Sequence, residues 1–551
     1  MAGFSAKGGG GASEGDPASD DLVASLQNRT SLGLPRHVQS VEGRYGAVAC
    51  GSPHAVRIGL DLLKSGGSAA DAAVGMACAM MVADPVNCSP AGRGHVLYRQ
   101  DGEEPHAING TTRAPEHVRE GAAPIPLPGI VGALLHLHGK SGRLSLQTIL
   151  QPVIELAETG FEVPDELAQI WAVRAGDLRD EDARNWYLPG GKIPVAGDIF
   201  CHAGLALFFR ELAATGKDPF TNIEFVSGFC ERNASKGLTW SDKDVWHIFP
   251  REGEVVRLAE EDWELVSIGR QGWGHTLLQI TALNQWAKRA GHSGAALELA
   301  ELMAIAQAFD DRPQHLRSLK PKSSPIPFED LLDRALFAEA EAWRNVRSAL
   351  SGELDKGDIA NIAPGMDRGV LGVASEERDT THMSVIDASG LQVSITQSIG
   401  PHFGARVVDP KYGILFGHSY RMEFDPVPLA EDVTEQCPSL LRKGDAVYAL
   451  GGAGSERIPG AVANVVRHLI AGDNLASAMC QPRANWVGPL VRLHVDAPKS
   501  LLEKLQHAGI NTEITDRGPV DHLGIVHAVG RCGASFEASA DPAYAGAAGV
   551  C

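Results

Sequence analysis

The sequence predicts an α+β fold in which a mostly helical first part precedes a part rich in strands. Apolar residues recur at intervals of three and four, the spacing of one helix face, in residues 145–159 and 297–309. From Thr381 onward the apolar runs are short and bounded by Gly, Asp or Ser, which is typical of strands. Strands are predicted at residues 381–387, 391–399, 448–450 and 525–530. Helices and strands that are segregated along the chain indicate the α+β class.

The composition is that of an ordinary globular protein. With 551 residues, of which 44% are apolar and 21% charged, the chain can bury a large core. Its formal net charge is −19, and it contains no long run of Lys or Arg. Nucleic acids and anionic membranes attract clustered basic residues, so neither is expected as a partner. A small-molecule or peptide-like substrate fits this composition better.

The cysteines and the composition of the N-terminus indicate whether a metal or cofactor is expected and where in the cell the protein is located. The nine cysteines are scattered and include no Cys-x-x-Cys pair, so they are interpreted as reduced structural residues, and no metal or cofactor is expected. Residues 1–21 are rich in Gly, Ser and Ala and lack the features of a signal peptide, and a disordered tail is predicted over residues 1–40. No apolar run reaches the length of about eighteen residues that spans a membrane. The expected location is therefore cytoplasmic.

Two helices with clear boundaries are predicted near the start of the ordered chain. The first, residues 54–64, ends at Gly66-Gly67, and Ser68 then begins the second, with Asp71 three residues later as in a capping box. The second helix, residues 69–82, consists almost entirely of Ala, Val, Met and Gly. Such small side chains allow another element to approach closely, so this helix is predicted to lie flat on a sheet.

The stretch Asp379-Thr380-Thr381-His382 begins a predicted hairpin. Its turn lies at residues 387–390, and equal distances from that turn place Ser398 roughly opposite Thr380. A threonine in this position suits a self-processing hydrolase, whose hydroxyl becomes a nucleophile once the threonine's own α-amino group is freed as the base. Residues 355–378 mix Gly, Pro and charge and are expected to form an exposed segment that gives access for processing. The alternative is that Thr380-Thr381 is merely a strand-favouring pair.

The segment Gly451-Gly452-Ala453-Gly454-Ser455 is a second candidate for chemistry. It follows a predicted strand and precedes a predicted helix at residues 458–471, which places backbone N–H groups at a helix start. Such groups can stabilise the oxyanion that forms during acyl transfer. Gly454 and Ser455 are therefore candidate catalytic residues together with Thr380 and Ser398.

A set of short motifs along the chain resembles the γ-glutamyltransferase family. The resemblance extends from about residue 45 to residue 551, and the order of the motifs is more specific than any one of them. The motifs are Gly66-Gly67-Ser68-Ala69-Ala70-Asp71-Ala72-Ala73, Leu127-Pro128-Gly129, Asp379-Thr380-Thr381-His382, Gly413-Ile414-Leu415, Gly454-Ser455-Glu456-Arg457-Ile458, Pro482-Arg483 and Ala540-Asp541-Pro542.

The resemblance implies a fold and a processing step. The implied fold is the four-layer αββα sandwich of N-terminal-nucleophile hydrolases, with a mostly helical large-chain portion. The implied precursor cuts itself between Asp379 and Thr380 into a large chain, residues 41–379, and a small chain, residues 380–551. These two chains are expected to stay associated in one intertwined sandwich. The mature Thr380 hydroxyl then attacks a substrate amide, and water or an amine resolves the acyl-enzyme.

Several positions depart from the family pattern around the expected substrate pocket. The arginine that grips the substrate α-carboxylate in the family corresponds to Thr111, and the neighbouring Arg113 is offset from that position. The paired serines that assist it correspond to Thr434 and Glu435, and a carboxylate at Glu435 would repel a bound carboxylate. The asparagine after the second hairpin strand corresponds to Gly400. Several replacements around one ligand indicate a different ligand.

A replacement anion site is expected among residues in loops. The stretch 417–423, which corresponds to the residues that hold the substrate α-amino group in the family, is altered and includes Arg421 and Glu423. Arg421 and His402 are the first candidates for the new site. The other candidates are Arg93, Arg406 and His418.

The leading hypothesis is an amidohydrolase of this family that acts on a small acyl amide other than glutathione. The alternatives are true γ-glutamyl hydrolysis or transfer with a rearranged pocket, an oxamate-type amidohydrolase, hydrolysis of a carbon–carbon bond in a biosynthetic pathway, and a catalytically silent scaffold. Relatives with the same nucleophile and different substrates show that the fold alone does not fix the bond that is broken.

Overall fold

The computed structural model describes most of the chain. The described residues are 26, 29–40, 43–118, 123–289, 291, 293–317, 380–424, 426–487, 490–507, 510–516, 518 and 523–551. Asp379, the expected exposed segment 355–378 and most of the expected N-terminal tail lie outside these residues. The tail prediction is wrong at its C-terminal end, because His37–Ser40 forms strand β1, which pairs with a strand from the far end of the chain.

Two seven-stranded antiparallel sheets form the centre of the molecule. Sheet 1 has the order β1, β18 (Ser535–Ala540), β17 (Ile525–Cys532), β13 (Ala446–Ala453), β12 (Ser439–Lys443), β9 (Trp263–Ile268) and β8 (Val255–Glu260). Sheet 2 has the order β19 (Ala547–Val550), β2 (Gly46–Cys50), β10 (Thr381–Asp387), β11 (Gln392–Ser398), β3 (Arg93–Arg99), β4 (His106–Gly110) and β7 (Arg251–Gly253). The expected hairpin at Thr381 is therefore the centre of sheet 2.

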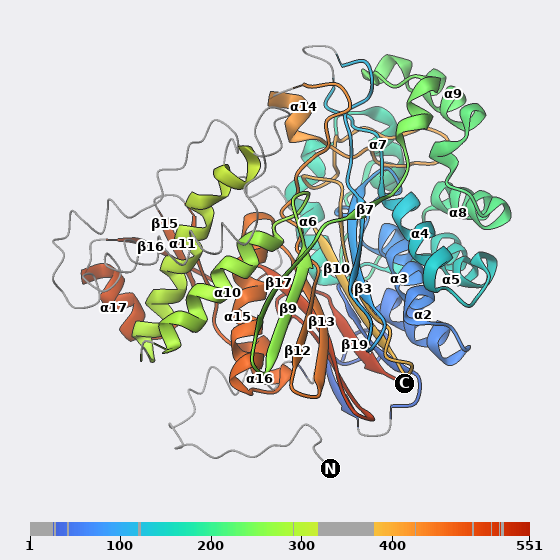
Figure 1. Cartoon of the computed structure of the whole chain (residues 1–551). Helices are drawn as coiled ribbons and strands as arrows, with labels where there is room; N and C mark the ends of the chain where they lie inside the picture. The colour runs from blue at the N-terminus through green and yellow to red at the C-terminus, as the bar shows by residue number, and fades with distance from the viewer. Residues whose placement is uncertain are drawn as a thin grey trace.

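The two sheets pack face to face. Buried side chains from both sheets form one apolar cluster, which includes Ala49 and Leu97 of sheet 2 and Val266, Leu440 and Ala449 of sheet 1. Small residues dominate on the β2 and β13 side of the interface, so the sheets approach closely there. Figure 1 shows β3 and β10 beside β9, β12 and β13 in the middle of the molecule.

Helices cover the outer face of each sheet. The helices over sheet 2 are α2 (Pro53–Lys64), α3 (Ala69–Ala83), α4 (Ile130–Ser141) and α5 (Leu146–Thr159), on the right in Figure 1. Those over sheet 1 are α10 (Gly274–Arg289), α11 (Ala295–Arg317), α15 (Ile458–Ala471) and α16 (Leu475–Cys480), on the left. This arrangement confirms the αββα sandwich.

The prediction for the small-residue helix is also confirmed. Every residue of α3 is buried, and Ser68 and Asp71 form a reciprocal capping box at its start. An apolar helix with so few large side chains can lie between sheet 2 and the helices outside it. Its place is fixed further by Asp387 in the hairpin turn, whose Oδ2 accepts a hydrogen bond of 2.8 Å from the Ala69 amide.

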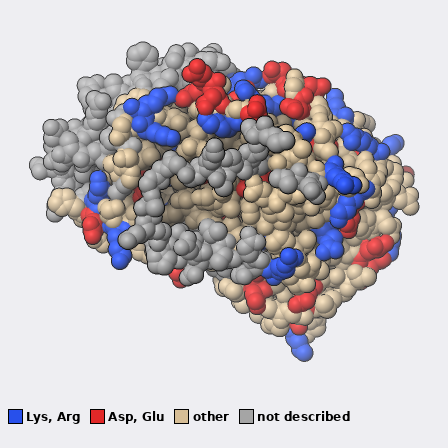
Figure 2. Space-filling model, turned by 90° about the horizontal axis from the view of Figure 1, so that it is seen from below, with Lys and Arg blue, Asp and Glu red and all other residues tan. Residues whose placement is uncertain are grey.

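The remaining elements lie at the periphery of the sandwich. They are α6 (Asp165–Arg174), α7 (Glu181–Tyr187), α8 (Ala203–Thr215), α9 (Ile223–Arg232), α14 (Tyr420–Phe424), α17 (Lys499–His507), the pair β5 (Phe161–Glu162) and β6 (Ile199–Phe200), and a small sheet of β14 (Ala484–Val487), β15 (Leu490–His494) and β16 (Asn511–Thr515). Among the described residues no helix is both long and apolar enough to cross a membrane. On the face in Figure 2, basic and acidic side chains are interspersed, so the net charge of −19 is not gathered there into one acidic field.

Candidate active site

Thr380 lies directly before β10, an inner strand of sheet 2, and is buried. Thr381 pairs with Gln397 of β11, so Thr380 lies opposite Ser398 in the continued register. This confirms the predicted position of Ser398. Opposite residues of antiparallel strands have their side chains on the same face about 5 Å apart, so Thr380 and Ser398 are neighbours on one face of the sheet.

The hairpin turn holds this register. Asp387 Oδ1 accepts hydrogen bonds from the Ser389 amide (2.8 Å) and the Ser389 hydroxyl (2.6 Å), and the Gly390 amide donates to the Asp387 carbonyl (3.0 Å). A slip by one residue would turn every side chain of the strand to the opposite face. The turn therefore fixes which face of sheet 2 carries Thr380.

His382 lies two residues after Thr380 on the same face and is fully buried between the sheets. Its Nδ1 is 2.8 Å from Thr396 Oγ1 and its Nε2 is 2.8 Å from Ser384 Oγ. Burial, with a smaller contribution from His527, lowers the pKa of His382 well below its usual value, so the ring is neutral. His382 belongs to the motif Asp379-Thr380-Thr381-His382, but no role was predicted for its side chain.

Gly451 of β13 brings sheet 1 against this histidine. A Cβ added at Gly451 would lie 2.4 Å from His382 Cε1, which leaves no space for any other residue. One step further from Thr380, the Ser394 hydroxyl donates to the Leu450 carbonyl (2.9 Å). The β10–β11 hairpin and β13 therefore run alongside each other. Thr380 and Ser398 lie next to the end of β13, and Gly454 and Ser455 follow that strand in sequence.

Gly454 and Ser455 form a left-handed turn between β13 and α15. Their φ angles are +119° and +55°, and the short helical turn Ser455–Arg457 leads into α15. The Arg457 Nε donates to the Gly454 carbonyl (2.7 Å), which turns that carbonyl away from the strand. A non-glycine residue such as Ser455 rarely adopts a positive φ, and such conformations gather at functional sites.

The hydroxyl of Ser455 adds a polar group to this turn. Ser455 Oγ is buried and has no hydrogen-bond partner among the described residues. A buried hydroxyl without a partner is costly unless a ligand or water satisfies it. This turn therefore provides backbone N–H groups and a hydroxyl at the end of the strand that faces Thr380.

The predicted pocket residues Thr111, Arg113 and Arg421 lie close together, and the side chain of each bonds to Glu431 or Asp432. Thr111 Oγ1 donates to the Asp432 carbonyl (3.1 Å), and the Arg113 guanidinium is paired with the Glu431 carboxylate. Arg421 Nη1 donates to the Glu431 carbonyl (3.0 Å). Glu431 is thus the centre of this group, and it leaves Arg113 poorly placed to bind a substrate anion.

Thr434 and Glu435 lie in the segment that leads into β12. The Thr434 amide donates to the Gln271 carbonyl (2.9 Å), and Thr434 is buried with its hydroxyl 3.5 Å from His95 Nδ1. Glu435 is partly exposed. The side chain of Glu423, in α14, lies outside the described residues, so its predicted role stays a prediction.

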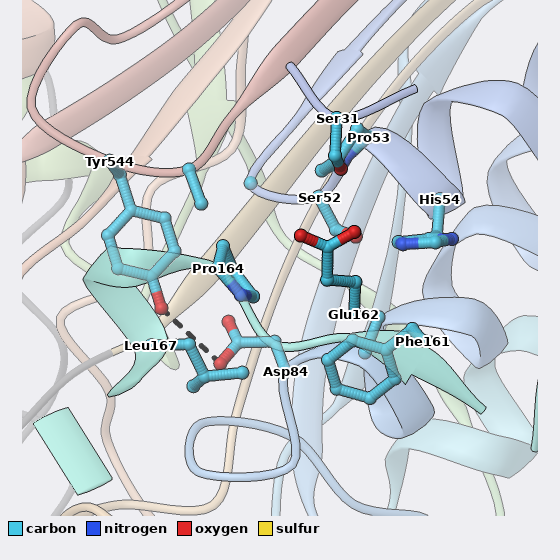
Figure 3. A pocket seen from close by; sticks show the side chains of 13 residues that line it. Ser31, Ser52, Pro53, His54, Asp84, Phe161, Glu162, Pro164, Leu167 and Tyr544 are labelled. Carbon is cyan, nitrogen blue, oxygen red and sulfur yellow. Dashed lines mark hydrogen bonds between the residues drawn. The ribbon is translucent and has the colours of Figure 1, made fainter. Parts of the chain in front are cut away.

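His402 lies in a different cluster, on the side of sheet 2 that the helices cover. Its Nδ1 is 2.9 Å from Asn87 Oδ1, and the Asn87 amide donates to Asp84 (3.1 Å). Figure 3 shows Asp84 and the Tyr544 hydroxyl joined by a hydrogen bond of 3.4 Å, beside a pocket of about 20 Å³ that also borders His54. Asn87 thus links His402 to Asp84, and the role of His402 as an anion ligand stays a prediction.

A buried ion pair beside Thr111 was not predicted. Arg93 Nη1 lies 3.5 Å from Asp432 Oδ2, and Asp432 also accepts hydrogen bonds from the hydroxyls of Thr112 (2.5 Å) and Ser419 (2.6 Å). Arg93 was among the other candidates for the anion site and Ser419 lies in the altered stretch 417–423, but Asp432 and Thr112 were not predicted. The only local signal was an arginine directly before a strand.

Comparison with known proteins identifies the family. The sequence profile described as Gamma-glutamyltranspeptidase matches residues 55–551. The chain belongs to this family. The glutathione hydrolase proenzyme of Bacillus subtilis is 25% identical over 546 residues, which cover 92% of this chain and 91% of that protein. The acylase ACY 1 proenzyme of a Pseudomonas species is 27% identical over 502 residues, which cover 84% and 86%.

A solved structure has the same fold. The cephalosporin acylase of Bacillus halodurans superposes with a TM-score of 0.75 over 93% of this chain and 96% of that chain, at 22% sequence identity. This γ-glutamyltranspeptidase family chain therefore has the N-terminal-nucleophile hydrolase fold, as the sequence resemblance implied. The relatives carry both glutathione hydrolase and acylase names, so membership in the family does not select one substrate.

Proposed function

We propose that this protein is a self-processing amidohydrolase with Thr380 as its nucleophile. In processing, Thr380 Oγ1 attacks the carbonyl carbon of Asp379, the peptide bond to the Thr380 nitrogen breaks, and an ester forms in its place. Water hydrolyses the ester, which leaves a carboxyl group on Asp379 and a free hydroxyl and α-amino group on Thr380. The large chain then ends at Asp379 and the small chain begins at Thr380.

The mature enzyme uses the new α-amino group as its base. An α-amino group has a reference pKa of about 7.7 to 8.0, which suits a general base near neutrality. It takes the proton of the Thr380 hydroxyl as the oxygen attacks the carbonyl carbon of an acyl amide, and later gives that proton to the leaving amine. The amides of Gly454 and Ser455 donate to the oxyanion. Water then cleaves the acyl ester and releases the acid.

The position of Thr380 carries this proposal. It directly precedes β10, an inner strand of sheet 2, opposite Ser398, and its face of the sheet meets the end of β13, where the Gly454-Ser455 turn begins. A nucleophile and a set of oxyanion donors thus come from facing strands of two packed sheets. Rigid strands hold such groups better than mobile loops do. The glutathione hydrolase and acylase relatives are both named proenzymes, which supports a processed precursor.

The substrate that we propose is a small acyl amide other than glutathione. Thr111 and Gly400 cannot supply the long side chains that the family uses for the glutamyl group, and Arg113 is paired with Glu431. A γ-glutamyl group would therefore lose charge-assisted contacts, each of which contributes about tenfold or more to binding.

Chromogenic anilides test this substrate assignment. We expect the purified enzyme to hydrolyse at least one simple acyl p-nitroanilide with a kcat/KM at least about tenfold higher than that for γ-glutamyl-p-nitroanilide. The Thr380→Ala protein provides the background rate. Faster turnover of the γ-glutamyl anilide would instead assign true γ-glutamyl hydrolysis with a rearranged pocket.

A further inference from the structure

A cavity lies at the end of sheet 2 away from Thr380, between helix α4 and the strands that this helix covers. Its volume is about 500 Å³, within the range of about 300 to 1,000 Å³ of small-molecule sites. Leu391, which follows the hairpin turn, lines the cavity, whereas Thr380 precedes the other end of the same hairpin. The seven residues of β10 lie between these two ends and span about 23 Å. The cavity is therefore separate from the proposed active site.

Side chains on the outer face of sheet 2 form the floor of this cavity. The register places Tyr98 of β3 opposite His106 of β4, and Ile108 of β4 opposite Glu252 of β7. All four line the cavity on the face that α4 covers. The rings of Tyr98 and His106 are stacked with their centroids 5.4 Å apart, and Ile108 and Leu391 are buried. The floor therefore offers flat rings and apolar side chains to a ligand.

The helix side of the cavity is basic. His136 and Lys140 lie one turn apart on α4, and Arg143 follows the helix. The Arg143 amide donates to both carboxylate oxygens of Asp71 (3.1 and 2.9 Å), and its Nη2 donates to the Ser389 hydroxyl (3.2 Å). These bonds hold Arg143 at the edge of the cavity. Within the described part of the chain, the side chains of His136 and Lys140 make no hydrogen bond or ion pair, so both can bind a ligand.

The strand side of the cavity carries the opposite charge. Glu252 of β7 and Glu103, between β3 and β4, both line it. Burial and the nearby charge of Glu252 raise the pKa of Tyr98, which agrees with a position of this carboxylate close to the floor. Neither glutamate forms an ion pair with Lys140, Arg143 or any other described residue. The opposite charges thus line one cavity but are too far apart to pair directly.

We infer that this cavity binds an amino acid with an aromatic side chain. The ligand carboxylate lies on the helix side against Lys140 and Arg143, and the ligand ammonium group lies on the strand side against Glu252. The ligand ring packs on the stacked rings of Tyr98 and His106. A zwitterion pairs with both sides of the cavity at once, and each charge-assisted hydrogen bond adds to its affinity. Because the site is remote from the nucleophile, the amino acid is an effector and not a substrate.

Three related compounds test this inference by calorimetric titration of the purified protein. Phenylalanine carries both charges, N-acetylphenylalanine lacks the ammonium group, and phenylalaninamide lacks the carboxylate. We expect phenylalanine to bind about tenfold more tightly than either of the other two, because each loses one charge-assisted hydrogen bond. Alanine, which has both charges but no ring, should bind more weakly than phenylalanine because it cannot pack on the floor.

Two variants assign the charges to the two sides. We expect Lys140→Gln to weaken the binding of phenylalanine by about 3- to 10-fold and to leave that of phenylalaninamide unchanged. Glu252→Gln should weaken the binding of phenylalanine by a similar factor and leave that of N-acetylphenylalanine unchanged. Lys64→Gln is the matched control, because Lys64 is also an exposed lysine in the last turn of a helix over sheet 2 and does not line the cavity.

The same titrations can overturn the inference. Equal affinities for phenylalanine and its two derivatives would contradict a site with two charged sides. Absence of phenylalanine binding up to about 10 mM, or an equal loss of affinity in Lys64→Gln and Lys140→Gln, would also contradict the site. None of these measurements needs turnover, so their outcome is independent of whether Thr380 is the nucleophile.

Discussion

At the scale of single residues, Gly451 and His382 join the two sheets beside the proposed nucleophile. The histidine ring fills the space where a side chain at residue 451 would lie. Its two ring nitrogens are each engaged by a hydroxyl of sheet 2, so the ring cannot turn away without losing a buried hydrogen bond. The close approach of β13 to β10 therefore depends on glycine at this position.

The variant Gly451→Ala tests this contact. We expect it to lower the free energy of unfolding by about 1 to 3 kcal/mol, because the new methyl group overpacks a buried site. The midpoint of urea unfolding, measured in the uncleaved Thr380→Ala chain, reports the change. Gly139→Ala is the control: an added Cβ there has open space on helix α4, so alanine should be neutral or stabilising by up to about 1 kcal/mol. Equal midpoints for the two variants would contradict the account.

The sequence predicted the relative positions of some candidate residues and not of others, for a physical reason. Thr380 and Ser398 were predicted because a hairpin is local and its turn sets the register. The pair of Arg93 and Asp432 was missed because 339 residues separate its members in sequence. The roles of Arg421 and His402 as anion ligands stay predictions. The partner of Arg421, the Glu431 carbonyl, is 10 residues away in sequence, and that of His402, Asn87, is 315 residues away.

At the scale of elements, helix α8 begins with an unusual cap. His202 is buried, and its Nδ1 accepts a hydrogen bond of 3.1 Å from the Leu205 amide, while Nε2 lies 3.2 Å from the Tyr187 hydroxyl. Burial lowers the pKa of His202 to about 4. A protonated Nδ1 could not accept from Leu205, so the cap exists only in the neutral form.

This cap predicts a pH dependence of stability. The unfolded His202 has a pKa near 6.5 and binds more protons than the folded one between pH 4 and 6.5, so its contribution is complete above pH 6.5 and is lost as the pH falls toward 4. In His202→Asn an amide that does not titrate replaces the cap. We expect the thermal midpoint of this variant to fall less than that of the natural protein between pH 6.5 and 4.5. An equal fall of the thermal midpoint in the variant and in the natural protein would show that His202 does not contribute to the pH dependence of stability.

The elements themselves were predicted where their signals are local. Ser68 and Asp71 marked the start of α3, and residues 458–471 were predicted as the helix that the structure has as α15. The strands β2, β4, β8 and β9 were not predicted. β2, with the sequence Gly-Ala-Val-Ala-Cys, is short and rich in alanine, and it is a strand because β10, more than 300 residues later, pairs with it.

At the scale of the whole molecule, the fold accounts for how one cut could leave a stable product. Sheet 2 alternates strands from before and after Thr380: β2 and β3 from the first part flank the β10 and β11 hairpin from the second. Sheet 1 likewise pairs β9 with β12 and β1 with β18. Two chains that share both sheets stay joined by backbone hydrogen bonds and the core between the sheets. The expected association of large and small chains follows from this interleaving.

The first residue of the small chain is the most direct test of the account, because it identifies the nucleophile and the cleavage together. Intact-mass analysis of the purified protein should give two chains, with the smaller one covering residues 380–551 and beginning with an unmodified Thr380. The Thr380→Ala chain should give one mass, that of the uncleaved precursor. A small chain that begins at another residue, or two chains in Thr380→Ala, would contradict the assignment of Thr380 as the self-processing nucleophile.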